Sequence, residues 1–282
     1  MPKIVDALER AVQDGRAIAA INAPGFDAMV GIAKAARHAS QPVIIQTSAR
    51  LVRKHGAPAI YSWFDAARRI TESECYLHLD HCQDEEILHA CIATGWDMVM
   101  FDGSSLPIED NITRSRALSV IAHANGVAIE GEVGAVGGEE DGHEAATNVA
   151  STDDIVRLAL EGQIDCIAIG FGNVHGDYSS TAHLRWDVYE SAHALAKLPL
   201  VLHGGTGLSD AEFLRAVRAG TGKINISTEL KKAYARVVVE DRLPDILRKD
   251  PAALHGKLED AAFEVALHHI TLFGSFSERT DK

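Results

Sequence analysis

The chain has 282 residues, of which 46% are hydrophobic and 24% are charged, and its formal net charge is -13. This composition is typical of a soluble globular protein and excludes a disordered or fibrous one. The excess of acidic residues argues against nucleic acid and anionic membrane surfaces as partners, because both repel a negatively charged protein. An anionic substrate would therefore have to be held by local groups.

Four cysteines, at positions 75, 82, 91 and 166, show neither a Cys-x-x-Cys motif nor the spacing of a disulfide framework. We expect them to be reduced thiols. The N-terminal sequence Met-Pro-Lys-Ile-Val-Asp lacks the apolar core of a signal peptide, and no apolar run approaches the roughly 18 residues that span a membrane. These features predict a cytoplasmic protein with no membrane partner.

Eight short segments rich in apolar and β-branched residues recur along the chain, separated by stretches with helical periodicity. They are predicted to be strands and cover residues 17–23, 42–48, 75–81, 97–103, 126–133, 165–172, 198–205 and 223–229. The intervening stretches carry helix end signals. Residues 84–94 stop at Gly95, and Ser209-Asp-Ala-Glu212 has the form of a capping box.

Strand and helix alternating in this way predict a parallel sheet with helical crossovers, and eight units favour closure into a single (β/α)8 TIM barrel. A doubly wound open sheet is the alternative, but no Gly-x-Gly-x-x-Gly follows the first strand, which weakens a dinucleotide-binding interpretation. Residues 230–282 are helical in pattern, and we expect a C-terminal extension that packs on the barrel or on another subunit. No linker or repeat divides the chain, so residues 1–282 are expected to form one domain.

The stretch Cys75-Tyr-Leu-His-Leu-Asp-His-Cys82 is apolar and β-prone and ends on Asp80 and His81. Residues at the end of a buried strand project beyond the carboxyl edge of the sheet, where α/β proteins build their sites. We therefore interpret Asp80 and His81 as a catalytic pair. The alternative is that Asp80 caps the helix starting near Asp84 and that His81 is a surface histidine.

Polar residues also end the other predicted strands. They are Asn22, Ser48, Asp102, Glu130, Glu132, His175, His203 and Asn225. A single histidine in such a place is more often structural, but His81, His175 and His203 would lie at one level of the barrel. Neutral imidazoles converging from separate strands are typical of Zn²⁺ sites, and three protein ligands leave a position open for substrate.

Glycine-rich turns flank two of these histidines, at residues 170–176 and 203–207. Glycine permits backbone conformations that aim several N–H groups into one concavity, as phosphate binding requires. In TIM barrels phosphate sites commonly lie after strands seven and eight, where this chain has Asn225-Ile-Ser-Thr228. Residues 134–148 form a long glycine- and acid-rich connection, which we interpret either as a lid over the barrel mouth or as a solvated surface loop.

These residues resemble the class II, metal-dependent fructose-bisphosphate and tagatose-bisphosphate aldolases, the ketose-bisphosphate aldolase family. The resemblance runs from about Asn22 to Lys231. It rests on the ordered motifs HLDHC, FDGS, EGEVG-x-x-GGEEDG, GFGNVHG, LHGGTG and KINISTELK.

The resemblance implies the roles of individual residues. His81, His175 and His203 would bind one catalytic zinc ion. Asp80 would be the acid/base at the C4 hydroxyl and aldehyde, and Glu140 would exchange the proton on the nucleophilic carbon. The implied reaction is the reversible cleavage of a ketose phosphate or bisphosphate to dihydroxyacetone phosphate and an aldehyde, through a metal-stabilised enediolate.

The same resemblance implies a second divalent-metal position at Asp102 and Glu132, and it allows for a monovalent cation. It implies a phosphorylated sugar substrate and a homodimer or homotetramer. The residues that would hold the substrate and its phosphate are Asn22, Ser48, Gly176, Gly204, Thr206, Asn225, Ser227 and Thr228.

Two positions depart from the family pattern. Many relatives carry a lysine four positions after the second metal histidine, where this chain has Ser179, and the usual serine of HGGSG is Thr206. The second change keeps the hydroxyl, but the first removes a positive charge near the phosphate. The reaction class is unaffected, whereas the identity of the ketose stays open.

Two other kinds of protein are compatible with a barrel that carries these residues. One is a metal-dependent hydrolase or isomerase, although an amidohydrolase would show His-x-His on its first strand, which offers only Asn22. The other is a binding or assembly protein that has lost its chemistry, and the presence of Asp80, Glu140 and the three histidines argues against it.

Overall fold

The computed structural model describes residues 2–140, 143–145, 147–175, 184–240 and 243–275. Its main strands are β1 Ile18–Asn22, β2 Val43–Ser48, β3 Cys75–Cys82, β4 Met98–Phe101, β5 Ala128–Val133, β8 Cys166–Ile169, β10 Leu200–Leu202 and β11 Thr221–Ile226. They pair in parallel in this order, and β11 pairs with β1 to close the barrel. Each overlaps one predicted segment, so the predicted (β/α)8 barrel is confirmed.

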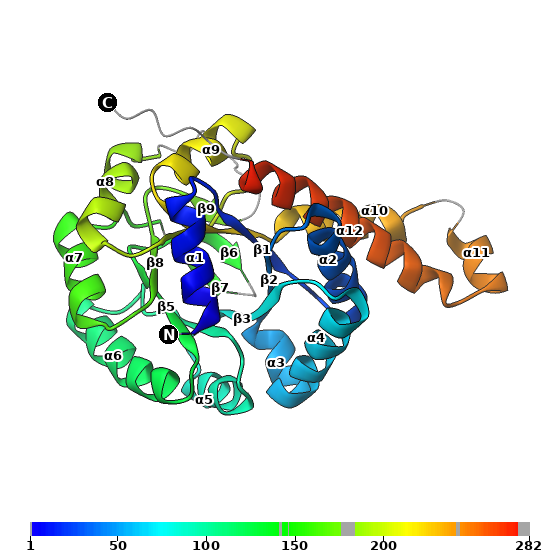
Figure 1. Cartoon of the computed structure of the whole chain (residues 1–282), viewed down its shortest axis with the longest axis horizontal. Coiled ribbons are helices and arrows are strands. Elements are labelled where there is room, and N and C mark those ends of the chain that lie inside the picture. Colours follow the sequence, from blue (N-terminus) through cyan, green and yellow to red (C-terminus); the bar gives the residue numbers. More distant parts are fainter. Residues whose placement is uncertain (1, 141–142, 146, 176–183, 241–242, 276–282) are drawn as a thin grey trace.

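Helices surround the barrel (Figure 1). Their bounds are α1 Lys3–Gln13, α2 Phe26–Ala39, α3 Ala49–His55, α4 Ala57–Thr71, α5 Glu85–Thr94, α6 Ile108–Ala124, α7 Thr152–Glu161, α8 Trp186–Ala196, α9 Asp210–Arg218, α10 Thr228–Val238, α11 Leu243–Lys249 and α12 Ala253–Gly274. The predicted end signals are confirmed. Asp84 caps α5 by accepting from the backbone N–H of Glu86, Gly95 ends it in the left-handed conformation, and Ser209 with Glu212 forms a capping box.

The barrel interior is apolar at its amino-terminal end. Side chains alternate across a strand, so every second residue faces inward. Ile18 and Ile44 belong to this inward set and pack with Ile4 and Leu8 of α1, all of them buried. Helix α1, which the sequence reasoning did not assign, thus covers this end of the barrel (Figure 1).

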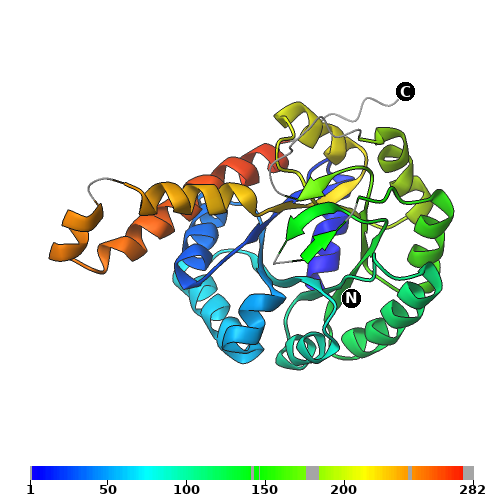
Figure 2. The same ribbon diagram turned by 180° about the vertical axis from the view of Figure 1, so that it is seen from behind.

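A small second sheet lies at the opposite end of the barrel from α1 (Figure 2). It contains β6 Gly137–Glu140, β7 His143–Ala145 and β9 Val174–His175. Strand β6 pairs antiparallel with β7 and parallel with β9. The connection expected over residues 134–148 therefore lies over the mouth, as a lid would, but it contains a β-hairpin. Glycine permits this packing, because a Cβ on Gly137 would lie 2.0 Å from Oγ1 of Thr147.

The C-terminal helices form the predicted helical extension. Helices α10, α11 and the start of α12 project to one side of the barrel (Figure 1). The middle of α12 crosses α2 closely, since a Cβ on Gly31 would lie 2.3 Å from the backbone oxygen of Glu259. Among the described residues, no helix combines the length and apolar character needed to cross a membrane.

Candidate active site

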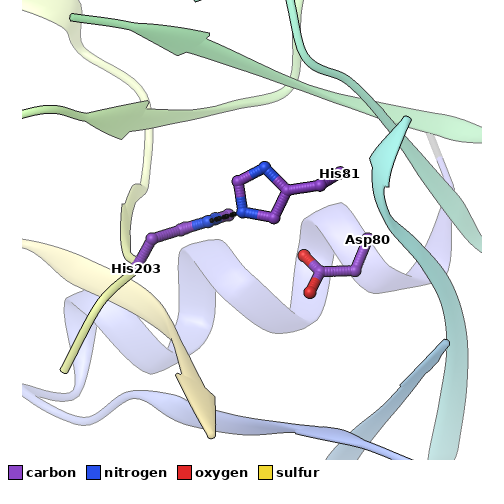
Figure 3. Close-up of side chains that lie close together, drawn as sticks. All are labelled: Asp80, His81 and His203. Carbon is purple, nitrogen blue, oxygen red and sulfur yellow. Dashed lines mark hydrogen bonds between the residues drawn. The ribbon is translucent and has the colours of Figure 1, made fainter. Parts of the chain in front are cut away.

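A local irregularity in β3 places Asp80 and His81 together at the carboxyl end of the barrel. Consecutive residues of a regular strand face opposite sides, so only one of the two would point inward. The β3–β4 register shifts between Leu79 and Cys82, and His81 has a φ of +36°. Non-glycine residues rarely adopt such a φ, and within a strand it marks a local strain of the kind that clusters at functional sites. Asp80 and His81 consequently both turn toward His203 (Figure 3).

The rings of His81 and His203 meet through one nitrogen each. His81 Nε2 lies 2.7 Å from His203 Nδ1. The other nitrogen of each ring contacts a carboxylate, with His81 Nδ1 3.1 Å from Asp102 Oδ2 and His203 Nε2 2.7 Å from Glu130 Oε1. A carboxylate accepts a hydrogen bond, so both outer nitrogens carry protons. The two inner nitrogens then offer lone pairs to one electrophile, either a shared proton or a metal ion.

The surrounding groups extend this pair into two candidate metal-binding sets. The first set contains Asp80, His81 and His203, and the second contains His81, Asp102 and Glu132. Oε2 of Glu132 lies 3.9 Å from both His81 Nδ1 and His203 Nδ1, and it has no hydrogen-bond partner among the described residues. Buried carboxylate oxygens are normally satisfied, and nitrogen–oxygen sets of this kind suit a divalent ion. The described side chains thus fit a divalent-metal centre, while the predicted ligand role of His175 stays a prediction.

The two carboxylates beside His81 differ in proton affinity. Burial and the neighbouring Asp102 raise the pKa of Glu132 to about 8. Burial alone would also raise the pKa of Asp102, but hydrogen bonds from His81 and Ser104 hold it below its ordinary value. In the metal-free protein, the negative charge of this pair of carboxylates is therefore concentrated on Asp102, whereas Glu132 can take up a proton.

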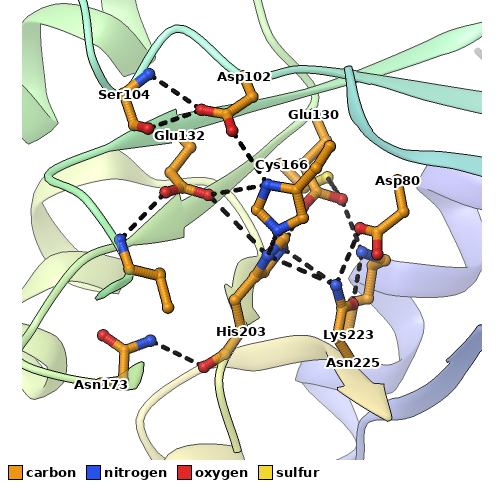
Figure 4. A network of polar contacts seen from close by, with 12 residues as sticks. Asp80, Asp102, Ser104, Glu130, Glu132, Cys166, Asn173, His203, Lys223 and Asn225 are labelled. Atoms are coloured by element: carbon orange, nitrogen blue, oxygen red, sulfur yellow. Dashed lines mark hydrogen bonds and ion pairs between the residues drawn. The ribbon is translucent and has the colours of Figure 1, made fainter. Parts of the chain in front are cut away.

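Three amides hold the carboxylate of Asp80 (Figure 4 shows part of this network). Asn22 Nδ2 and Gln46 Nε2 each donate to Oδ2 at 3.0 Å, and Asn225 Nδ2 donates to Oδ1 at 3.1 Å. Asp80 does not cap the helix that follows β3, because Asp84 does. A buried carboxylate fixed in this way is suited to accept or return a proton at a defined place.

The sequence reasoning missed several residues that support the site. Gln46, His78 and Lys223 are fully buried inside the barrel below the predicted residues. Asn173 donates from Nδ2 to the backbone oxygen of His203 and accepts from the N–H of Phe171, which fixes the turn that carries His203. A signal was available for the first three, because each lies two positions before a predicted strand-end residue and so shares its inward direction.

The structure shows the surroundings of four other predicted residues. Ser48 caps α3, accepting at Oγ from the backbone N–H of Leu51. Gly204 has a φ of +60°, and a Cβ there would lie 2.7 Å from the backbone oxygen of Val174. Asn22 Oδ1 and Ser227 Oγ are buried without a partner among the described residues, so both are available to a ligand.

Other predicted residues are only partly described. Thr206 lies in the turn after β10, and Thr228 is the first residue of α10. The backbones of Glu140 and His175 lie in β6 and β9, but their side chains are outside the described part of the chain. Gly176 and Ser179 lie outside the described residues altogether.

The fold and the site define a TIM barrel with a candidate divalent-metal centre at its carboxyl end. The family description "Fructose-bisphosphate aldolase class-II" matches residues 3–278. A sulfofructosephosphate aldolase of Alkalicoccus urumqiensis is 29% identical over 95% of this chain and 94% of that protein. A fructose-bisphosphate aldolase of Streptococcus pyogenes serotype M1 is 34% identical over 83% of this chain and 80% of that protein.

Solved structures agree with the sequence comparisons. The crystal structure of the YdjI aldolase from Escherichia coli K12 superposes with a TM-score of 0.83 at 27% identity, over 98% of both chains. The chain belongs to the class II fructose-bisphosphate aldolase family. It is therefore an enzyme of the metal-dependent aldolase class, a carbon–carbon lyase, which excludes the hydrolase, the isomerase and the non-enzymatic alternatives.

Proposed function

We propose that the protein cleaves a ketose phosphate or bisphosphate reversibly to dihydroxyacetone phosphate and an aldehyde, with zinc as its catalytic ion. The observation that carries this proposal is the meeting of His81 Nε2 and His203 Nδ1 at 2.7 Å, with a carboxylate on the far side of each ring. His175 would be the third ligand, as the resemblance to the family implies. When bound, the ion supplies Lewis-acid polarisation of the substrate carbonyl.

The chain's own residues would move the protons. Asp80, held by amide donors on both carboxylate oxygens, would take the proton of the C4 hydroxyl during cleavage and return it during condensation. Glu140, in the small sheet over the mouth, would exchange the proton on the nucleophilic carbon. A base on such a segment can approach after the substrate binds and exclude water from the reacting carbon.

Binding of the substrate would use the polar atoms around the mouth. Asn22 Oδ1 and Ser227 Oγ have no partner among the described residues, and Asn225 already contacts Asp80. The phosphate would lie at the turns after β10 and β11, where Gly204 has its left-handed conformation. The proposed cradle also includes Thr206 in the turn after β10, Thr228 at the start of α10 and Ser48 at the end of β2. Gly176, its last member, lies outside the described residues.

A second divalent ion would bind at Asp102 and Glu132, and the resemblance to the family also allows for a monovalent cation. We also propose that the protein is cytoplasmic and forms a homodimer or homotetramer. Val238 is the last residue of α10, and Val239 follows it. Both are exposed on the part of the C-terminal helices that projects from the barrel, which supports a contact between subunits there. Sedimentation velocity of the parent and of Val238→Asp, with Lys231→Asp as the charge-change control, tests the subunit contact.

The experiment that tests the function is a cleavage assay over a panel of ketoses. The panel contains fructose and tagatose bisphosphates, ketose 1-phosphates, sulfofructose phosphate and unphosphorylated ketoses. It includes both sulfofructose phosphate and fructose bisphosphate because the two relatives are named after these different substrates. We expect cleavage of a substrate with a phosphate on the ketone half, inhibited by a chelator and restored by zinc. Cleavage of none of them by the zinc-loaded protein would contradict the proposal.

A further inference from the structure

A polar layer lies inside the barrel directly below the proposed site. It consists of Gln46, His78, Glu130 and Lys223, whose exposure to solvent is 0%. Each lies two residues before a mouth residue of the same strand, namely Ser48, Asp80, Glu132 and Asn225, and therefore points inward as those residues do. The next inward positions below belong to the apolar end of the barrel and include Ile44, Tyr76 and Ala128.

The layer contains a buried ion pair. Nζ of Lys223 lies 2.9 Å from Oε2 of Glu130. Taking both charges out of water costs free energy that their attraction does not reliably return, so such a pair is weak evidence of a contribution to stability. Apolar residues would fill the same space at lower cost, as they do one level below. The pair therefore calls for an explanation in terms of what it contacts.

Both members of the pair also contact residues of the site (Figure 4). Oε1 of Glu130 lies 2.7 Å from Nε2 of His203. Lys223 donates to Oδ1 of Asn225 at 2.7 Å, which leaves the amide nitrogen of Asn225 facing Oδ1 of Asp80 at 3.1 Å. Since Lys223 can only donate, it dictates which end of the Asn225 amide faces Asp80.

The neutral members of the layer act on Asp80 in the same way. Nδ1 of His78 lies 3.2 Å from Oε1 of Gln46, and Nε2 of Gln46 donates to Oδ2 of Asp80 at 3.0 Å. In both Gln46 and Asn225, the amide oxygen thus contacts a residue of the layer and the amide nitrogen donates to Asp80. The layer contacts the site through three side chains, which are His203, Asn225 and Asp80.

We propose that Lys223 and Glu130 are positioning residues of the aldol site. Glu130 holds His203 in the tautomer protonated at Nε2, so that Nδ1 presents its lone pair to the metal position. Lys223 keeps Glu130 paired and fixes the Asn225 amide with its N–H groups on Asp80. Carboxylates that accept from a metal-binding histidine orient the ring and strengthen its bond to the metal. This inference rests on the proposed function for its catalytic consequence, but the orientation of His203 can be measured without any activity.

The first test uses the unaltered protein, labelled with ¹⁵N in its histidines. Imidazole nitrogen shifts and one-bond N–H couplings identify which nitrogen of His203 carries the proton, in the zinc-loaded and in the chelated protein. We expect a proton on Nε2 in both. A His203 protonated at Nδ1 with a bare Nε2 would overturn the proposal, whether or not the protein cleaves a ketose.

The second test replaces the ion pair by a neutral pair of similar shape, Glu130→Gln with Lys223→Met, which leaves no buried charge unpaired. We expect a folded protein whose dissociation constant for zinc, measured by competition with a chromogenic chelator, rises by about 10–100-fold. We also expect kcat to fall further than KM rises. Zinc affinity and kcat both within twofold of the parent would show that the layer only fills space, and would overturn the proposal.

The control removes a buried hydrogen bond from the same strand at a distance from the site. Tyr189 OH and Thr221 Oγ1 are 2.9 Å apart and buried, and Thr221 lies two residues before Lys223 on β11. Tyr189→Phe should leave zinc affinity and the His203 tautomer as in the parent. If Tyr189→Phe weakened zinc binding as much as the double change, the effect would not be specific to the layer and the proposal would fail. A double variant that does not fold leaves the decision to the tautomer of the unaltered protein.

Discussion

His81 Nε2 and His203 Nδ1 lie 2.7 Å apart, and each ring contacts a carboxylate through its other nitrogen. The two histidines come from β3 and from the turn after β10, far apart in the sequence. Their carboxylates leave both inner nitrogens as acceptors, so the pair is suited to bind a single electrophile, either a shared proton or a metal ion. The closed barrel thus brings together the two histidines of the candidate metal centre.

Asp80→Asn should lower kcat by about 10²–10⁴-fold, because the amide cannot take the hydroxyl proton. Three amides donate to the two carboxylate oxygens of Asp80. In the variant, the new NH₂ group replaces one of these oxygens and therefore faces at least one of these donors. Steady-state cleavage together with zinc content checks the prediction. Asp84→Asn is the matched control, since Asp84 caps α5 outside the site and its change should leave kcat alone. Near-parental kcat in Asp80→Asn would remove Asp80 from the mechanism.

Glu140→Ala should slow the exchange of solvent hydrogen into the nucleophilic carbon of dihydroxyacetone phosphate, because Glu140 is the proposed base for that proton. Incorporation of deuterium measured by NMR checks this prediction. Glu139→Ala is the control, because it removes a carboxylate from the neighbouring residue of β6. Unchanged exchange in Glu140→Ala, with loss in Glu139→Ala, would transfer the role to Glu139.

Glu132 gives a prediction for the pH dependence of stability in the metal-free protein. Burial and Asp102 raise its pKa in the folded state to about 8 from an ordinary 4.5. Protonated Glu132 therefore stabilises the folded state, and this contribution to the free energy of unfolding is full below pH 4.5 and is lost as pH rises toward 8. Glu132→Gln should remove this decline, so the chelated variant should be the more stable protein at pH 8 and should converge with the parent at low pH.

The measurement for Glu132 is urea unfolding of the two chelated proteins between pH 5 and pH 8, the window set by its ordinary and raised pKa. Over one pH unit, the titration of a single group changes the free energy of unfolding by at most about 1.4 kcal/mol. Parallel stability profiles for the parent and Glu132→Gln would show that Glu132 is ionised in the metal-free protein. The increased stability of the variant should disappear when zinc is added, because zinc binding favours the parent.

Ser179→Lys should tighten binding of a dihydroxyacetone phosphate analogue several-fold. The resemblance to the family implies a lysine at this position, and a charge-assisted hydrogen bond to phosphate contributes about 1.5–3 kcal/mol. Calorimetry of the analogue, with zinc content measured in parallel, checks the prediction, and Ser180→Lys is the control for added charge alone. Ser179 and Ser180 lie outside the described residues. Unchanged or weaker binding in Ser179→Lys would mean that another group already compensates the phosphate, and the substrate would have to be reassigned.

The barrel could be predicted from the sequence because its strands are buried on both faces. Such strands appear as short apolar runs, and all eight were found, with β11 beginning at Thr221, two residues before the predicted start. The polar residues at the strand ends interrupt these runs, which is why Asp80, His81 and His203 could be identified. The capping box of Ser209 and Glu212 could be predicted for a similar local reason, since both side chains bond to backbone within the same turn. Asp84 was expected only as the start of a helix, which it caps.

The missed residues depend on contacts between distant segments. Lys223 and His78 lie within strands, where an apolar interior was assumed, and only the closed barrel shows that they meet Glu130 and Gln46. The hairpin of β6 and β7 was missed because its glycine- and acid-rich sequence has low strand propensity. Its pairing with β9 supplies the backbone hydrogen bonds that the local sequence does not favour.

The most direct test of the account is the rate of ketose bisphosphate cleavage while the chelated protein is titrated with zinc. We predict no cleavage without metal, a rise that is complete at one catalytic ion per chain, and no recovery in His203→Ala at the same zinc concentration. Asp84→Asn should titrate like the parent. Cleavage by the chelated parent protein, or a parental rate in His203→Ala, would contradict the claim that His81 and His203 bind the catalytic ion.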